Sequence, residues 1–205
     1  MLINNIEFAH ELITRALTEC KHDKKESDFN NLYLCDFTMG NGNDTLFMSR
    51  LAQKYGIKIY AFDIQPQALQ STLANLDKNG AEKNYTLIND SHSEMDKYLP
   101  AEGEMVCGMF NLGYLPGGNK TITTLRETTL TAIEKAVDRL TVGGVLTVTI
   151  YPGHPEGKIE GELIERYLSS LSNHEFNVLK YALCNKTDPP YVMVTQKIRK
   201  KGNVL

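Results

Sequence analysis

The sequence predicts an α/β fold built on a mostly parallel sheet of seven strands that ends in an antiparallel hairpin. Short apolar runs, which are typical of buried strands, alternate with longer segments of helical periodicity. Most of these runs end at polar residues or glycines. The last two runs are joined by only about seven residues, which leaves no room for the crossover helix that parallel strands need.

The N-terminal segment is predicted to be a helix followed by a connector. Apolar residues from 6 to 17 recur at helical spacing, which predicts a helix there. Residues 21–31 are highly charged and lack apolar periodicity, so we expect an exposed connector. We interpret residues 1–31 as an N-terminal addition to a single domain that spans residues 1–205.

The remaining elements carry recognisable boundary signals. Asp44 is placed to cap one helix, and Pro66 suits the first turn of the next. Leu69, Leu73 and Leu76 are expected to form the buried stripe of that second helix. The predicted strands are 32–35, 57–62, 85–88, 105–110, 145–150, 176–183 and 191–196, and the predicted helices are 44–55, 66–78, 122–140 and 160–171.

A parallel sheet that ends in an antiparallel hairpin is typical of Rossmann-like class I methyltransferases. Right-handed crossovers would cover both faces of this sheet with helices. In an open sheet of this kind, ligands bind at the carboxyl ends of the strands, near the point where strand order reverses. The residues that directly follow each strand therefore carry the functional interpretation.

The composition excludes several classes of protein. The 205 residues include 22 Lys and Arg against 25 Asp and Glu, and a net charge of −3 excludes coating of nucleic acid through bulk positive charge. No apolar run approaches the ~18 residues of a membrane span, and the first residues do not resemble a signal peptide. The four cysteines are far apart, which predicts reduced thiols, no metal site and a cytoplasmic location.

A glycine-rich turn follows the first predicted strand. Gly40, Asn41, Gly42 and Asn43 would let the backbone approach a ligand closely, or they form a tight turn without a ligand. Thr45 replaces the third glycine of a dinucleotide fingerprint, which disfavours a nicotinamide cofactor.

The second and third strands also end in groups that suit a nucleotide. Asp63 could hold the ribose hydroxyls of NAD or of S-adenosylmethionine, or it caps the following helix. Asp90, Ser91 and His92 suit an adenine edge, although Asp90 or Ser91 could equally cap a helix. Together with the glycine turn, these strand ends predict a nucleotide cofactor.

The segment after the fourth strand is similar to the Asn-Pro-Pro-Tyr motif of amino-group methyltransferases. Asn111 is the candidate acceptor of a hydrogen bond from a reacting amine, and Tyr114 is the candidate aromatic that packs on the base. These two residues are the predicted catalytic pair. The alternative is that Asn111 is a turn residue and Tyr114 an aromatic at the rim.

Candidate substrate contacts lie in three further loops. Tyr151 and His154 follow the fifth strand, where His154 is either a proton acceptor or, as we prefer, a structural or substrate contact. Lys120 and Lys186 lie in loops expected at the same edge and could contact phosphates, or they are solvated surface charges.

These motifs resemble the YtqB-like "putative rRNA methylase" family over residues 32–198, most specifically in the run that begins at Asn111. The resemblance implies S-adenosylmethionine as cofactor, methylation of 5-aminomethyl-2-thiouridine at the tRNA wobble position, contact with the anticodon region and, in many members, a homodimer. The cofactor contacts that it implies are Asn41, Asn43, Asp63, Gln65, Ser91 and His92. The charged connector at 21–31 is longer than we expect for this family.

Three other functions stay open at this point. The same cofactor could serve methylation of rRNA, or of a small amine or phenol. A nicotinamide-dependent oxidoreductase is a remote alternative, which both Thr45 and the closing hairpin disfavour. The overall acidity is the main objection to a tRNA substrate, because phosphate contacts need local cations.

Overall fold

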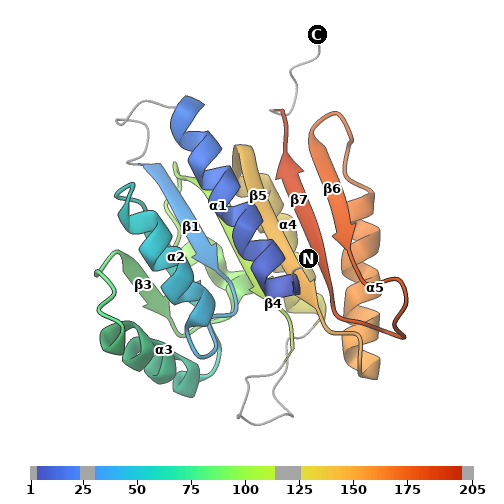
Figure 1. Cartoon of the computed structure of the whole chain (residues 1–205), viewed down its shortest axis with the longest axis horizontal. Helices are drawn as coiled ribbons and strands as arrows, with labels where there is room; N and C mark the ends of the chain where they lie inside the picture. The colour runs from blue at the N-terminus through green and yellow to red at the C-terminus, as the bar shows by residue number, and fades with distance from the viewer. Residues whose placement is uncertain (1–3, 24–30, 114–125, 200–205) are drawn as a thin grey trace.

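A computed structural model describes residues 4–23, 31–113 and 126–199 of the chain. These residues form a single seven-stranded sheet in the order β3-β2-β1-β4-β5-β7-β6, with helices on both faces (Figure 1). The strands are β1 (Leu32–Asp36), β2 (Lys58–Phe62), β3 (Tyr85–Ile88), β4 (Glu104–Asn111), β5 (Leu140–Ile150), β6 (Phe176–Tyr181) and β7 (Tyr191–Lys197).

The pairing of the strands confirms the predicted architecture. The first five strands pair in parallel, and β7 pairs antiparallel with both β5 and β6. Strand order reverses at β1, which lies between β2 and β4. The carboxyl ends of β1 and β4 therefore form the position where open α/β sheets bind their ligands.

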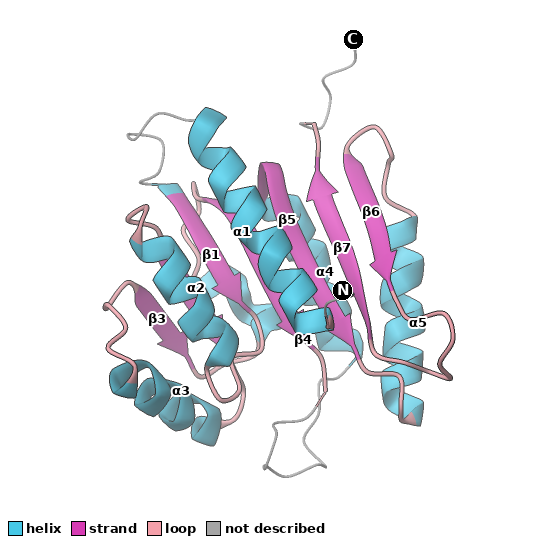
Figure 2. Cartoon of the chain, viewed as in Figure 1, coloured by secondary structure: helices cyan, strands magenta, loops and turns pink. Residues whose placement is uncertain are grey.

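The helices form one layer on each side of the sheet (Figure 2). Apolar residues of α1 (Asn5–Asp23) and α2 (Asn43–Gln53) pack on one face. The other face is covered by the short 3-10 helix η2 (His92–Lys97), α4 (Arg126–Arg139) and α5 (Pro155–Ser169). The remaining helix, α3 (Pro66–Lys78), lies beside α2.

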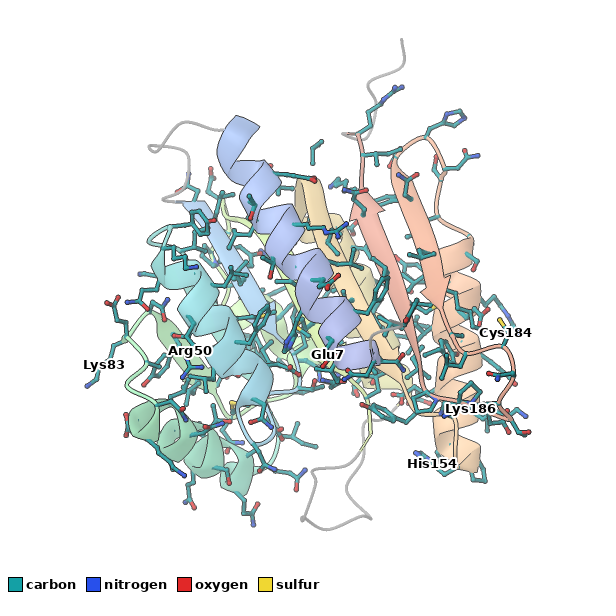
Figure 3. All side chains as sticks on the ribbon, viewed as in Figure 1. Glu7, Arg50, Lys83, His154, Cys184 and Lys186 are labelled. Carbon is teal, nitrogen blue, oxygen red and sulfur yellow. The ribbon has the colours of Figure 1, made fainter. Side chains whose placement is uncertain are left out.

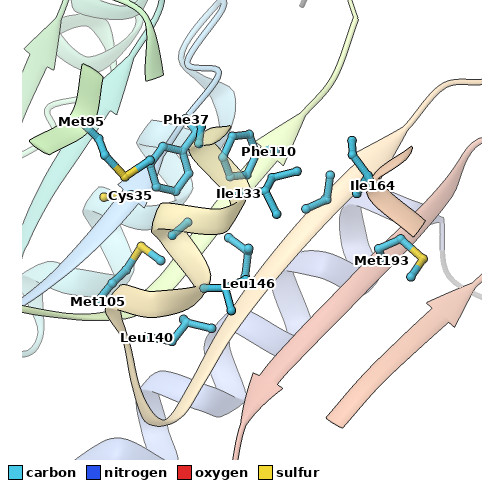
Figure 4. Close-up of a cluster of buried hydrophobic side chains, with 14 of the residues drawn as sticks. Cys35, Phe37, Met95, Met105, Phe110, Ile133, Leu140, Leu146, Ile164 and Met193 are labelled. Atoms are coloured by element: carbon cyan, nitrogen blue, oxygen red, sulfur yellow. The ribbon is translucent and has the colours of Figure 1, made fainter. Parts of the chain in front are cut away.

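The larger apolar core lies between the sheet and α4 (Figure 4). Phe37, directly after β1, stacks on Phe110 of β4 with ring centroids 4.3 Å apart, and Phe62 of β2 also stacks on Phe37, with centroids 5.9 Å apart. All three rings are almost fully buried. This aromatic packing stabilises the ends of three strands at the edge where the candidate site lies.

Several predicted boundaries of helices and strands were wrong. The helix expected at 160–171 begins at Pro155, and the strand expected at 145–150 begins at Leu140. In α3, Leu76 of the predicted leucine stripe is buried as expected, but Leu73 is 42% exposed, and the other buried residues are Ala68 and Thr72. This helix packs against α2, β3 and the glycine turn after β1, where the small Ala68 and Thr72 fit.

Candidate active site

The loops at the carboxyl ends of four strands are joined by main-chain hydrogen bonds. Phe37 N donates to Met109 O at 2.9 Å, and Met39 N donates to Phe62 O at 2.9 Å. Asp63 N donates to Ile88 O at 3.1 Å. These bonds fix the segments after β1 and β2 against their neighbours, so the predicted strand-end residues are assembled at one edge, as expected.

The glycine turn after β1 packs tightly against α3. Gly40 and Gly42 have φ angles of 50° and 79°, in the left-handed region that favours glycine. A Cβ on Gly42 would lie 2.8 Å from the main-chain Cα of Thr72. Thr72 Oγ1 donates to Gly40 O at 3.1 Å, and Asn75 Nδ2 donates to Asn41 O at 2.9 Å. Sequence reasoning missed these two supporting residues of α3.

Asp63 holds the same turn from the end of β2. Its Oδ2 accepts from Gly40 N at 3.1 Å, and its Oδ1 accepts from Gln65 N at 2.9 Å. Burial raises the pKa of this carboxyl, partly offset by those bonds. A carboxylate has about four acceptor positions, so Asp63 retains capacity for further hydroxyl donors.

The residues after β3 are engaged in local structure. Ser91 caps η2 by accepting from Ser93 N at 3.3 Å, which confirms the capping alternative for this residue. Asp90 accepts from the hydroxyl of Tyr98 at 2.7 Å, and this bond lowers its pKa. His92 is buried edge-on to Phe110 and its Nε2 has no partner among the described residues; burial lowers its pKa to about 4.

Three carboxylates converge around the glycine turn. Asp36 is fully buried at the end of β1, where it accepts from Thr38 N at 3.1 Å and from Thr45 Oγ1 at 2.6 Å. Burial, with the nearby charges of Asp44 and Asp63, raises the pKa of Asp36 to about 7. Thr45, which stands where a dinucleotide fingerprint has its third glycine, thus donates a hydrogen bond to a buried carboxyl group. The arrangement creates a negative potential that favours a cationic group.

Asn111, at the end of β4, is fixed through its main-chain N–H and its side-chain NH2. Its main-chain N donates to Thr38 Oγ1 at 2.7 Å, and its side-chain Nδ2 donates to Asp44 Oδ2 at 2.5 Å. Its Oδ1 is buried and has no partner among the described residues. The prediction that Asp44 caps α2 was wrong, because the N-cap is Gly42 and no side-chain bond caps this helix.

Asp44 has a second partner, which sequence reasoning missed. His10 Nε2, on α1, lies 2.7 Å from Asp44 Oδ1. The His10 ring stacks on Phe47 of α2, with centroids 3.7 Å apart and planes 4° from parallel. No signal near residue 10 in the sequence points to this contact, since the partner lies 34 residues further along the chain.

The structure describes only some of the predicted substrate contacts. His154 caps α5 by accepting from Gly157 N at its Nδ1, 3.0 Å away, which supports the structural interpretation (Figure 3). Tyr151 is 38% exposed, and burial together with the charge of Asp44 raises its pKa. Tyr114 and Lys120 lie outside the described residues, so their predicted roles stay predictions.

Among residues 4–23, 31–113 and 126–199, no group of three or more His, Cys, Asp or Glu could hold a metal ion. No helix within these ranges is long and apolar enough to cross a membrane. Cys20, Cys35 and Cys107 are buried free thiols, as expected, whereas Cys184 is an exposed one.

Comparisons with known proteins agree with this geometry. A family model described as "Putative rRNA methylase" matches residues 59–197. The chain is 38% identical over 165 residues to a chloroplastic tRNA (mnm5s2U34)-methyltransferase of Arabidopsis thaliana; the match covers 77% of this chain and 60% of that protein's length.

Two solved structures have the same fold over their whole length. A protein of Clostridium thermocellum, described as a putative rRNA methylase, is 33% identical with a TM-score of 0.83, covering 97% of this chain and 100% of the other. A putative methyltransferase of Streptococcus mutans, solved in complex with SAH, is 35% identical with a TM-score of 0.80, covering 96% and 99%.

Proposed function

Because the chain belongs to the "Putative rRNA methylase" family, we propose that it is an S-adenosylmethionine-dependent methyltransferase whose substrate is a tRNA. The reaction proposed is transfer of a methyl group to the aminomethyl nitrogen of 5-aminomethyl-2-thiouridine at the wobble position. The Arabidopsis relative, named for this kind of modification, supports the substrate class. The Streptococcus mutans relative, which holds the demethylated cofactor, supports the cofactor.

The glycine turn and Asp63 fit the nucleoside part of this cofactor. Asp63 retains acceptor capacity for two ribose hydroxyls after its bonds to Gly40 N and Gln65 N. Those main-chain bonds also hold the carboxylate in place before the ligand arrives. Asn41, Asn43 and the residues after β3 stay predicted contacts of the same nucleoside.

The charges around the turn suit the reactive part of the cofactor. S-adenosylmethionine supplies an electrophilic methyl group carried on a positively charged sulfonium. Asp36, Asp44 and Asp63 converge here, and after burial the charges of Asp44 and Asp63 contribute to the raised pKa of Asp36. A bound cation would offset this repulsion, so the site should favour the charged cofactor over its neutral thioether product.

The observation that carries the acceptor side of the proposal is the buried Oδ1 of Asn111, which has no hydrogen-bond partner among the residues that the structure describes. An unsatisfied buried acceptor costs about 1–3 kcal/mol, so a donor from a ligand is the natural compensation. An amine has an N–H to donate to this oxygen and keeps its lone pair free to attack the methyl carbon. The N–C bond then forms as the C–S bond breaks, and the product amine loses one proton to solvent.

Local cations at the same edge would meet the phosphates of the anticodon region. Lys186 lies in the loop between β6 and β7 (Figure 3), and Lys158 lies in the first turn of α5. The two segments are in contact, because Lys158 Nζ lies 4.0 Å from Oδ1 of Asp188 in the same loop as Lys186. That ion pair is exposed and therefore weak, so Lys158 can exchange it for a phosphate. A homodimer, which we also propose, would double this positive surface.

The direct test is nucleoside mass analysis. Purified protein and S-adenosylmethionine are incubated with tRNA that carries 5-aminomethyl-2-thiouridine, and the digested nucleosides are compared before and after reaction. We expect a gain of one methyl group on this nucleoside. The matched control is the same tRNA without the aminomethyl group, which should not be methylated.

Two outcomes would replace the proposal. Methylation of rRNA but not of the tRNA would assign a ribosomal substrate, and methylation of a small amine or phenol alone would assign a small-molecule enzyme. Salt provides a second discriminator, since tRNA binding should weaken steeply as salt rises while binding of a small neutral substrate should not.

A further inference from the structure

We propose that His10 and Asp44 are positioning residues that fix the side-chain amide of Asn111 with its carbonyl oxygen available to the reacting amine. The inference rests on the proposed function for the role of Asn111, and on the geometry alone for the chain of contacts. His10 Nε2 lies 2.7 Å from Asp44 Oδ1, and Asp44 Oδ2 accepts from Asn111 Nδ2 at 2.5 Å.

Both oxygens of Asp44 are used, one for each neighbour. A carboxylate can only accept hydrogen bonds, so the side-chain group of Asn111 that faces it must be the NH2. The carbonyl oxygen is thereby turned to the opposite side of the amide, where it is buried and has no partner among the described residues. Without Asp44, rotation by 180° about the last side-chain bond would exchange the two groups.

His10 sets the position of the carboxylate in turn. The His10 side chain is 25% exposed and that of Asp44 12%, so the bond between them is largely shielded from water. Stacking on Phe47 fixes the plane of the His10 ring, and α1 is anchored to the sheet by the fully buried Ala9 and Ile13. The contact is therefore made between rigid elements, as a positioning contact requires.

This arrangement makes the N-terminal helix part of the active site. The helix α1 lies over β4 and β5 in Figure 1, and through His10 it reaches the end of β4 where Asn111 lies. We expect His10 to affect the methyl-transfer step, because the orientation of the amine acceptor matters most in the transition state. It should not affect cofactor affinity, because the described contacts of the His10 ring are with Asp44 and Phe47, not with Asp63 or the glycine turn.

The test is a double-mutant cycle between His10 and Asn111. His10→Phe keeps a ring to stack on Phe47 and removes the donor, whereas His10→Gln keeps an N–H donor at a similar reach. His174→Phe, at an exposed histidine in the turn before β6, is the matched control. Single-turnover methylation of the aminomethyl tRNA and calorimetric affinity for S-adenosylhomocysteine are measured for each variant.

We expect His10→Phe to slow methylation by about tenfold in the parent and by less than about twofold in an Asn111→Ala background. His10→Gln should recover most of the rate, and the affinity for S-adenosylhomocysteine should stay within about twofold. An equal loss in both backgrounds, or no loss in the parent, would overturn the proposal. If His10→Phe does not fold, Asp44→Asn takes its place in the cycle with the same expected coupling.

An NMR measurement separates failure of this inference from failure of the proposed function. The side-chain NH2 of Asn111, bonded to a carboxylate, should give a shifted pair of signals in 15N-labelled protein. We expect His10→Phe to move this pair and His174→Phe to leave it unchanged, whatever the protein methylates. An unmoved pair would refute the chain of contacts, whereas moved signals with no methylation of tRNA would refute only the assigned substrate.

Discussion

The two halves of the carboxyl edge are built in opposite ways. After β1 and β2, on the cofactor side, the main-chain N–H groups of Gly40 and Gln65 donate to the carboxylate of Asp63. After β4, on the acceptor side, the buried Oδ1 of Asn111 has no partner among the described residues. The glycine turn and Asp63 are thus fixed before any ligand binds, whereas the Asn111 oxygen still needs a donor.

This difference predicts which property a substitution in each half of the site should affect. Main-chain bonds hold the cofactor side in one conformation, so substitutions there act first on stability and cofactor affinity. The acceptor side depends on a few side chains that converge from α1, α2 and β4, so substitutions there should act on turnover. Substitutions on each side test whether the cofactor side controls stability and cofactor affinity while the acceptor side controls turnover.

The largest effect is expected on stability from Gly42→Ala, on the cofactor side. The variant would hold a side chain at a φ of 79° and bring its Cβ within 2.8 Å of the Thr72 main chain. Left-handed strain and overpacking together should lower the free energy of unfolding by about 3 kcal/mol. Denaturant unfolding measures this loss, and affinity for S-adenosylmethionine should fall with it.

Gly56→Ala is the control for this prediction. Gly56 has a φ of 66° but nothing within 4 Å of the position of a Cβ. It should therefore lose only about 1 kcal/mol, the cost of the left-handed conformation itself. Equal losses in the two variants would show that the contact with α3 does not constrain the turn.

The next effect is expected on turnover, from Asn111→Ala on the acceptor side. Loss of the oxygen that accepts from the amine should slow single-turnover methylation by about 100-fold, comparable to removal of one positioned hydrogen bond in an active site. Affinity for S-adenosylhomocysteine should be unchanged. Asn177→Ala, on the exposed face of β6, is the control and should leave both quantities unaltered. A rate within about twofold of the parent would remove Asn111 from the catalytic role.

The same division explains what the sequence could reveal. Strand-end groups such as Gly40, Gly42 and Asp63 could be predicted because a parallel sheet brings all its carboxyl ends to one edge. The capping role of His154 was also within reach, since Pro155 directly after it is a common first residue of a helix.

Long-range contacts could not be predicted in this way. Asp44 was interpreted as a helix cap because its local neighbours suggest nothing else, yet its partners lie 34 and 67 residues away in the chain. His10 lies on a helix that sequence periodicity could predict, but the sequence does not show where on the sheet this helix packs. The leucine stripe of α3 was predicted correctly at Leu76 but not at Leu73, because periodicity does not show how wide a face the neighbours cover.

A smaller effect on affinity is expected from Asp63→Asn. The amide keeps one acceptor oxygen and loses the charge, so it can hold either the main chain or a ribose hydroxyl well, but not both. Affinity for S-adenosylhomocysteine should fall about tenfold, or about 1.4 kcal/mol, in calorimetry. Asp77→Asn, at an exposed position on α3, is the control. Unchanged affinity at Asp63 would contradict its role at the ribose.

The smallest effect concerns Asp36, which links the two halves through its buried charge. Its pKa is raised from 3.8 to about 7, so the folded state holds a proton that the unfolded state has lost between these values. Its contribution to stability is therefore full below pH 3.8 and is lost as pH rises through about 7. His92 acts in the opposite sense, because its pKa falls from 6.5 to about 4 and its contribution is lost as pH falls through that range.

Asp36→Asn removes only the first of these two contributions. Its amide can still bond Thr38 N and Thr45 Oγ1, so packing should be kept. Relative to the parent, the Tm of the variant should rise progressively between about pH 4 and pH 7, by a few degrees at the upper end, and stay level above that. Thermal unfolding across this range measures the difference. A difference that stays constant with pH would show that Asp36 does not titrate in this range.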